Sequence, residues 1–181
     1  MCAMQPQPKG EKKMTELFAQ PYDITAQGFY FKTADEYQEK AAKARNASGF
    51  PVEEYEIQFI DGDGIDAALF EALSVHQGNF PQFLDACDTW DDHQKRKTII
   101  AVGECGYSFD LKAGDPEDFD VDIYEVDSLR ELAEQFVDDG LFGDIPERLQ
   151  NYLDYDAIAR DLSMDYSEIT IDGTRLVYRC G

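Results

Sequence analysis

The spacing of hydrophobic and polar residues predicts a mixture of strands and helices from residue 22 onward. Residues 54–60 alternate between hydrophobic and polar side chains, which is typical of a strand with one buried face. Residues 129–137 instead place hydrophobic side chains at helical spacing, and Ser128 and Glu131 form a capping box at the start of that helix. The sequence therefore favours an α+β fold without internal repeats.

Other segments extend this interpretation. Residues 168–178 predict a hairpin, because Asp172 and Gly173 favour a two-residue turn between alternating segments. Thr33 and Glu36 form a second capping box. We expect further strands at residues 22–32, 97–104, 107–111 and 120–125, and further helices at residues 33–45, 66–75, 80–90 and 146–162.

These elements suggest three small parts after a leader. Residues 1–20 contain Pro, Gln and Lys without periodicity, so we expect a flexible leader. Residues 21–64 predict a β-α-β unit, residues 65–97 an acidic helical middle unit, and residues 98–181 a C-terminal α+β domain.

The net charge of −22 is distributed unevenly along the chain. Residues 51–94 contain eleven acids and no Lys or Arg, and residues 115–172 contain nineteen acids and three arginines. Residues 1–50 are nearly neutral. A salt-adapted protein is the alternative explanation for high acidity, but it should spread its acids over every segment. The segregation favours a functional acidic surface.

The chain shows few signs of enzymatic chemistry. It has no P-loop, no G-x-S-x-G and no dinucleotide-binding glycine pattern, and His76 and His93 lack spaced partners. Residues 61–66 (DGDGID) suggest a calcium loop, but Asp66 and Ala72 occupy the positions where an EF-hand needs Gly and Glu. We prefer a plain turn there. We predict no catalytic, cofactor-binding or metal-binding residue.

The cysteines and hydrophobic runs bear on the compartment. No secretory signal or membrane-spanning run is apparent, and the cysteines are far apart without a C-x-x-C pair. We expect reduced thiols, with buried side chains at residues 87, 105 and 180, and a cytoplasmic protein.

Residues 141–162 read LFGDIPERLQNYLDYDAIARDL. This segment resembles the hallmark of the ArdA antirestriction proteins, in which a Gly-Leu and a Pro precede a Y-x-D-Y…R-D-L run. The matching positions are Pro146, Leu149, Tyr152, Asp154, Tyr155, Arg160, Asp161 and Leu162. Residues 29–41, 53–61 and 129–137 resemble other elements of the family in the same order. Ala159 departs from the Gly that the family usually has before the Arg-Asp pair.

The resemblance implies a bacterial, non-enzymatic inhibitor associated with mobile genetic elements. It implies an elongated three-part α+β subunit, a homodimer, and mimicry of B-DNA. The expected partner is the methyltransferase core of a type I restriction–modification enzyme, whose DNA-binding groove the protein would occupy in competition with duplex DNA. An acidic adaptor for another basic protein is the alternative, and a carboxylate-based metal hydrolase ranks last.

Elementary electrostatics is compatible with mimicry. Acids three or four residues apart on a helix lie about 5–6 Å apart, and duplex DNA carries one charge per roughly 1.7 Å of its axis. One exposed ion pair contributes only about 0–1 kcal/mol, so binding must be distributed over many carboxylates. We expect no direct nucleic-acid binding, because the phosphates would be repelled.

The expected contact carboxylates follow from these segments. They are Asp115, Glu117, Asp118, Asp120, Asp122, Asp127, Glu131, Glu134, Asp138, Asp139, Asp144, Glu147, Asp156 and Asp165. Pro146, Tyr152, Asp154, Tyr155, Arg160 and Asp161 are expected to support the fold, with the arginine paired to a neighbouring aspartate.

Overall fold

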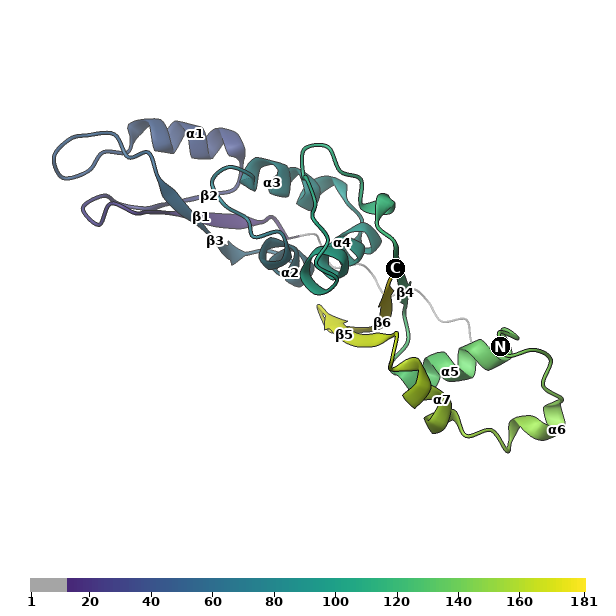
Figure 1. Ribbon diagram of the computed structural model, residues 1–181. Helices are drawn as coiled ribbons and strands as arrows, with labels where there is room; N and C mark the ends of the chain where they lie inside the picture. Colours follow the sequence, from purple (N-terminus) through teal and green to yellow (C-terminus); the bar gives the residue numbers. More distant parts are fainter. Residues whose placement is uncertain (1–12) are drawn as a thin grey trace, which may run out of the picture. The chain divides into compact units, whose positions relative to one another are not determined.

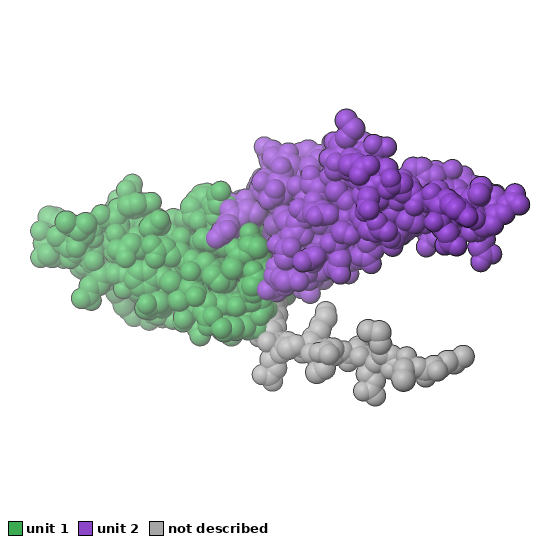
Figure 2. All heavy atoms as spheres, turned by 90° about the horizontal axis from the view of Figure 1, so that it is seen from below, with its two compact units in different colours: residues 1–70, 74–89 green, residues 71–73, 90–181 purple. Residues whose placement is uncertain are grey.

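Residues 13–181, which are the part of the chain that the computed structural model describes, contain both strands and helices (Figure 1). These residues form two compact units (Figure 2). Unit 1 extends to Phe70 and includes Ser74–Thr89, and unit 2 consists of Glu71–Leu73 and Trp90–Gly181. Each unit contains a small antiparallel sheet and helices, so the predicted α+β class is confirmed. The three-part division remains a prediction.

Unit 1 is built on a three-stranded sheet in the order β2-β1-β3. The central strand β1 (Glu16–Pro21) pairs with β2 (Phe29–Phe31) on one side and β3 (Tyr55–Asp61) on the other. The helices that follow are α1 (Ala34–Lys43), α2 (Gly64–Ala72), whose last two residues belong to unit 2, and α3 (Phe80–Thr89). The N-cap predicted at Thr33 is confirmed, since its side chain accepts a hydrogen bond from the Glu36 amide. The reciprocal half of the capping box is shifted by one residue, because the Glu36 carboxylate accepts from the Lys32 amide.

Aromatic rings form the core of unit 1. The Phe31 ring lies 5.0 Å from Tyr37 of α1 and 5.1 Å from Phe80 of α3, measured between centroids, and both pairs meet edge to face. Leu17 of the central strand β1, which is the pairing partner of Phe31, is fully buried. Edge-to-face contacts stabilise a core beyond simple burial, and these join α1 and α3 to the sheet.

The expectation of a flexible leader is wrong for residues 16–20, which lie in β1. Leu17 and Ala19 are completely buried and alternate with the less buried Glu16, Phe18 and Gln20, but the strand is only six residues long and Phe18 interrupts the hydrophobic–polar alternation. Residues 1–12 lie outside the described part of the chain. The strand expected at residues 22–32 is reduced to β2, because the Asp23 carboxylate accepts hydrogen bonds from the Thr25 amide and hydroxyl and stabilises a turn.

Unit 2 combines helices with a second sheet in the order β4-β6-β5. The short 3₁₀ helix η2 and strand β4 precede the long helix α5, and a hairpin closes the unit. The elements are α4 (Asp92–Thr98), the π-helical η1 (Ile99–Glu104), η2 (Pro116–Asp118), β4 (Val121–Tyr124), α5 (Leu129–Asp138), α6 (Glu147–Gln150), α7 (Tyr155–Leu162), β5 (Ser167–Ile171) and β6 (Thr174–Cys180).

The helix predicted after Ser128 and the C-terminal hairpin are both confirmed. Leu132 and Phe136 of α5 are buried in a cluster with Val177 of β6. The hairpin turn places Asp172 and Gly173 at positive φ, 46° and 75°, as a two-residue turn of this kind requires. The apolar face of α5 therefore packs on the sheet.

Two predicted elements of unit 2 are wrong. Residues 97–104 are helical rather than extended, because Asp91 and Gln94 form a capping box that starts α4, and the helix continues through the buried Ile99 and Ile100. A short apolar run suits a buried helix as well as a strand. Residues 107–111, expected to pair with that run, form no strand.

The helix expected at residues 146–162 is two helices, α6 and α7. Asp154 starts the second, because its carboxylate accepts a hydrogen bond from the Ala157 amide at 3.0 Å. Of the helices in residues 13–181, none has the length and hydrophobicity needed to cross a membrane.

Candidate functional site

The expected contact carboxylates all lie in unit 2, from the η2 region to the turn after α7. Twelve of the fourteen are exposed, and Asp122 and Glu134 are half-buried. An exposed carboxylate keeps its hydration and its charge at neutral pH. The acidity of this segment is therefore at the surface of the unit rather than in its core.

Four of these acids form ion pairs inside unit 2. Arg130 of α5 contacts Glu134 one turn later at 3.2 Å and Asp156 of α7 at 2.6 Å, so it joins two neighbouring helices. Asp122 of β4 pairs with Arg179 of β6 at 2.6 Å. Glu117 and Lys97 are 3.5 Å apart. These four carboxylates have part of their charge compensated locally.

The pairing also affects the arginines. The hydrogen bond and charge of Asp156, with a smaller contribution from Glu134, raise the pKa of Arg130 above its usual value. The hydrogen bond from Asp122 does the same for the pKa of Arg179. Both guanidinium groups remain charged and hold the surface acids in place.

The other ten candidate acids form no ion pair with any residue from 13 to 181. Asp115 accepts a hydrogen bond from the Glu117 amide, and Glu131 accepts one from the Asp127 amide, which orients both carboxylates. We name these ten the unpaired acids. They are Asp115, Asp118, Asp120, Asp127, Glu131, Asp138, Asp139, Asp144, Glu147 and Asp165.

The family-like segment has mainly local structural contacts. Pro146 precedes α6 as its N-cap, Asp154 caps α7, and the Arg130 guanidinium lies 5.8 Å from the centre of the Tyr155 ring. Tyr152 is 84% exposed. The expected ion pair between Arg160 and a neighbouring aspartate is absent from the described residues, where both Arg160 and Asp161 are exposed.

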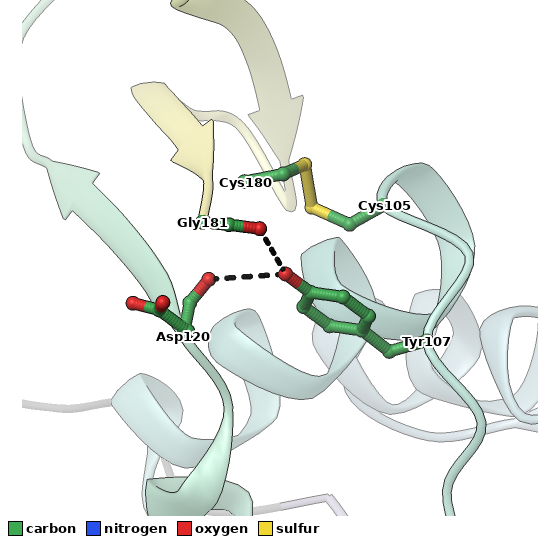
Figure 3. The surroundings of a disulfide bond; sticks show 5 residues. All are labelled: Cys105, Tyr107, Asp120, Cys180 and Gly181. Atoms are coloured by element: carbon green, nitrogen blue, oxygen red, sulfur yellow. Dashed lines mark hydrogen bonds between the residues drawn. A yellow bond between two sulfur atoms is a disulfide. The ribbon is translucent and has the colours of Figure 1, made fainter.

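A disulfide joins Cys105, just after η1, to Cys180 at the end of β6 (Figure 3). The expectation of reduced thiols is wrong for this pair, which is 75 residues apart in the sequence and could not be paired from spacing. The Tyr107 hydroxyl donates to the Gly181 carbonyl at 2.8 Å and approaches the Asp120 carbonyl at 3.4 Å. The segment after η1 is thus tied to the C-terminal strand.

Next to this connection lies a surface hollow of about 510 Å³ that the sequence did not indicate. Three aromatic rings line it, from Tyr107, Phe109 and Phe119. Its aspartates are Asp110, Asp115, Asp118 and Asp120, its other two lining residues are Ser108 and Gly114, and none is Lys or Arg. We call it the aromatic hollow. The sequence signal for this hollow is the mixture of aromatic and acidic residues at positions 107–120. The strand predicted at residues 107–111 does not suggest a hollow there.

The metal alternatives gain no support. In the described part of the chain, no three His, Cys, Asp or Glu side chains are placed to hold an ion together. Asp61 of the suspected calcium loop instead pairs with Lys13 at 2.5 Å, and this hydrogen bond lowers the pKa of Asp61.

Comparison with protein families gives one assignment. The family model described as antirestriction protein (ArdA) matches residues 8–175, which is most of the chain. No curated protein matches the chain. The family's members are non-enzymatic inhibitors whose targets are type I restriction–modification enzymes. Together with the mixed α+β fold and the exposed acids of unit 2, this match shows that the chain belongs to the ArdA antirestriction family.

Proposed function

We propose that this protein is a DNA mimic that occupies the DNA-binding groove of a type I restriction–modification enzyme. The observation that carries the proposal is the set of ten unpaired acids on unit 2, which leave their charge facing solvent. A groove that binds phosphates through Lys and Arg would attract such a surface, while the surface offers no base edge to read. Competition with duplex DNA follows directly.

The unpaired acids are the proposed contacts, and binding is shared among them. An exposed ion pair contributes about 0–1 kcal/mol, so no single carboxylate is indispensable. Glu117, Asp122, Glu134 and Asp156 contribute less in this proposal, because their charge is compensated within the unit. Direct binding to DNA is excluded from the proposal, since like charges repel.

The proposal includes a homodimer that acts in the bacterial cytoplasm, where type I enzymes meet incoming DNA. Its role would be to protect conjugative or phage DNA on entry. Two copies of unit 2 would double the length of acidic surface facing the enzyme. Sedimentation of the purified protein at micromolar concentration tests the dimer.

A type I methylation assay tests the function. The protein is titrated against fixed enzyme at several concentrations of duplex DNA, and the proposal expects inhibition whose midpoint rises with DNA concentration. Absence of inhibition of several type I enzymes at any ratio would defeat it. An acidic adaptor would instead recover another basic protein from a host lysate and no restriction subunit.

A further inference from the structure

We propose that the aromatic hollow of unit 2 binds the guanidinium group of an arginine side chain of the partner protein. The identity of that partner rests on the proposed function, whereas the binding of a guanidinium does not. The hollow would add one contact that depends on the shape of the bound side chain, in addition to the attraction between the many surface carboxylates and the partner.

The charge of the hollow selects a cation. Asp118 and Asp120 make no ion pair or side-chain hydrogen bond with any residue from 13 to 181, so their oxygens can accept from a ligand. Asp110 accepts a hydrogen bond from the Lys112 amide at 2.9 Å and Asp115 accepts one from the Glu117 amide at 3.0 Å, which orients both carboxylates. The described acids are not grouped as metal ligands, so an organic cation fits better than a metal ion.

The shape of the hollow selects a flat cation. The Tyr107 and Phe119 rings stack on each other, with 5.9 Å between centroids and 7° between planes, and Phe109 lies 5.1 Å from Phe119 in a tilted arrangement, so the lining of the hollow offers flat aromatic surface. A guanidinium group is planar and weakly hydrated, stacks on aromatic faces, and donates paired hydrogen bonds to a carboxylate. A lysine ammonium is a strongly hydrated point charge, so we expect it to bind more weakly to a site made of aromatic faces and carboxylates.

The walls of the hollow are held in place before any ligand arrives. The Tyr107 hydroxyl is bonded to the Gly181 carbonyl, and the disulfide lies two residues before Tyr107 and one before Gly181 (Figure 3). Phe109 packs directly on Gly114, where an added Cβ would clash with the ring. A preformed site loses less conformational entropy on binding than one that must be ordered.

Nuclear magnetic resonance titration of the full chain tests the proposal. The probe is N-acetyl-arginine amide, and its neutral isostere N-acetyl-citrulline amide is the matched ligand control. The expected result is saturable shifts of the Tyr107, Phe109 and Phe119 ring protons with arginine, weaker shifts with N-acetyl-lysine amide, and none with citrulline. Equal shifts with citrulline, or shifts that leave the three rings unchanged, would overturn it.

Two variants locate the site. Asp118→Asn and Phe119→Leu are each expected to weaken arginine binding about 3- to 10-fold, in line with one exposed ion pair or one cation–π contact. Asp172→Asn is the control, because it removes the same charge in the exposed turn between β5 and β6, where Asn suits the positive φ of 46°. If Asp118→Asn and Asp172→Asn weaken arginine binding equally, the affinity depends only on the net charge of the protein and the hollow is not a binding site.

The same variants separate the hollow from DNA mimicry. If the protein inhibits methylation but does not bind arginine at the rings, the hollow proposal fails while mimicry stands. If it binds arginine at the rings but inhibits no type I enzyme, the hollow proposal stands and the proposed function fails. Asp118→Asn, which keeps the side-chain shape, gives this answer even if Phe119→Leu fails to fold.

Discussion

Breaking the link between Cys105 and Cys180 should destabilise unit 2 selectively. The perturbation is Cys105→Ser, compared with chemical reduction of the unaltered protein. The bond closes a loop of 75 residues that contains β4, α5, α6, α7 and the hairpin, so it restricts the unfolded chain strongly.

The expected size follows from the loop length. The chain-entropy relation gives about 4.5 kcal/mol at 25 °C for a loop of this length, and measured losses for natural disulfides are typically about 2–5 kcal/mol. With a urea dependence of about 1–2 kcal/mol per molar for a unit of this size, the unfolding midpoint of unit 2 should fall by roughly 2 M. Unit 1 contains neither cysteine and should keep its midpoint.

Urea titration with two probes measures this effect. The chain has a single tryptophan, Trp90, whose ring contacts Phe109 in unit 2 and reports its unfolding by fluorescence. Amide hydrogen exchange of β1 and β3 reports unit 1. Cytosolic disulfides are rare, so a thiol titration of the native protein accompanies the measurement. Equal midpoints for oxidised, reduced and Cys105→Ser protein would refute the reasoning, as would ready reaction of the Cys105 and Cys180 thiols in the untreated native protein.

Three other predictions concern charge. Replacing Asp138, Asp139, Asp144 and Glu147 by amides should weaken enzyme binding about 30-fold, at roughly 0.5 kcal/mol for each exposed charge; unchanged binding would remove these acids from the contact. Moderate salt should raise the melting temperature by screening repulsion among the unpaired acids, and a flat or falling value would contradict it. Burial, with a smaller effect of neighbouring Tyr55, raises the pKa of Tyr37 to about 12. The folded state therefore favours the protonated hydroxyl of Tyr37. The stability that this preference contributes is complete below pH 10 and should be lost as the pH rises from about 10 to 12. Tyr37→Phe should reduce that alkaline loss in urea titrations, and an identical loss in both proteins would contradict the assignment.

Local sequence signals predicted the elements whose cause is local. Ser128 and Thr33 start helices because their side chains accept hydrogen bonds from amides three residues ahead. Asp172 and Gly173 form the hairpin turn for an equally local reason. Exposure of the acids around α5 also followed from helical spacing, since its apolar face is buried against Val177.

Features set by tertiary contacts were not predictable from one sequence. β1 is short, and its burial depends on pairing with β2 and β3 on both sides. The sequence predicts a strand where the structure has the helical η1, because an apolar run such as Ile99-Ile100 suits any buried element. The ion pair between Arg130 and Asp156 depends on the packing of α5 against α7, which spacing along the chain does not reveal.

Direct competition for the enzyme is the measurement closest to the central claim. A fluorescent duplex is bound to a type I methyltransferase core, and its anisotropy is followed as this protein is added at increasing salt. The account predicts complete displacement of the duplex, with affinity for the protein falling steeply as salt rises. A ternary complex that retains the duplex, or binding that does not change with salt, would contradict the claim that the unpaired acids take the place of DNA phosphates.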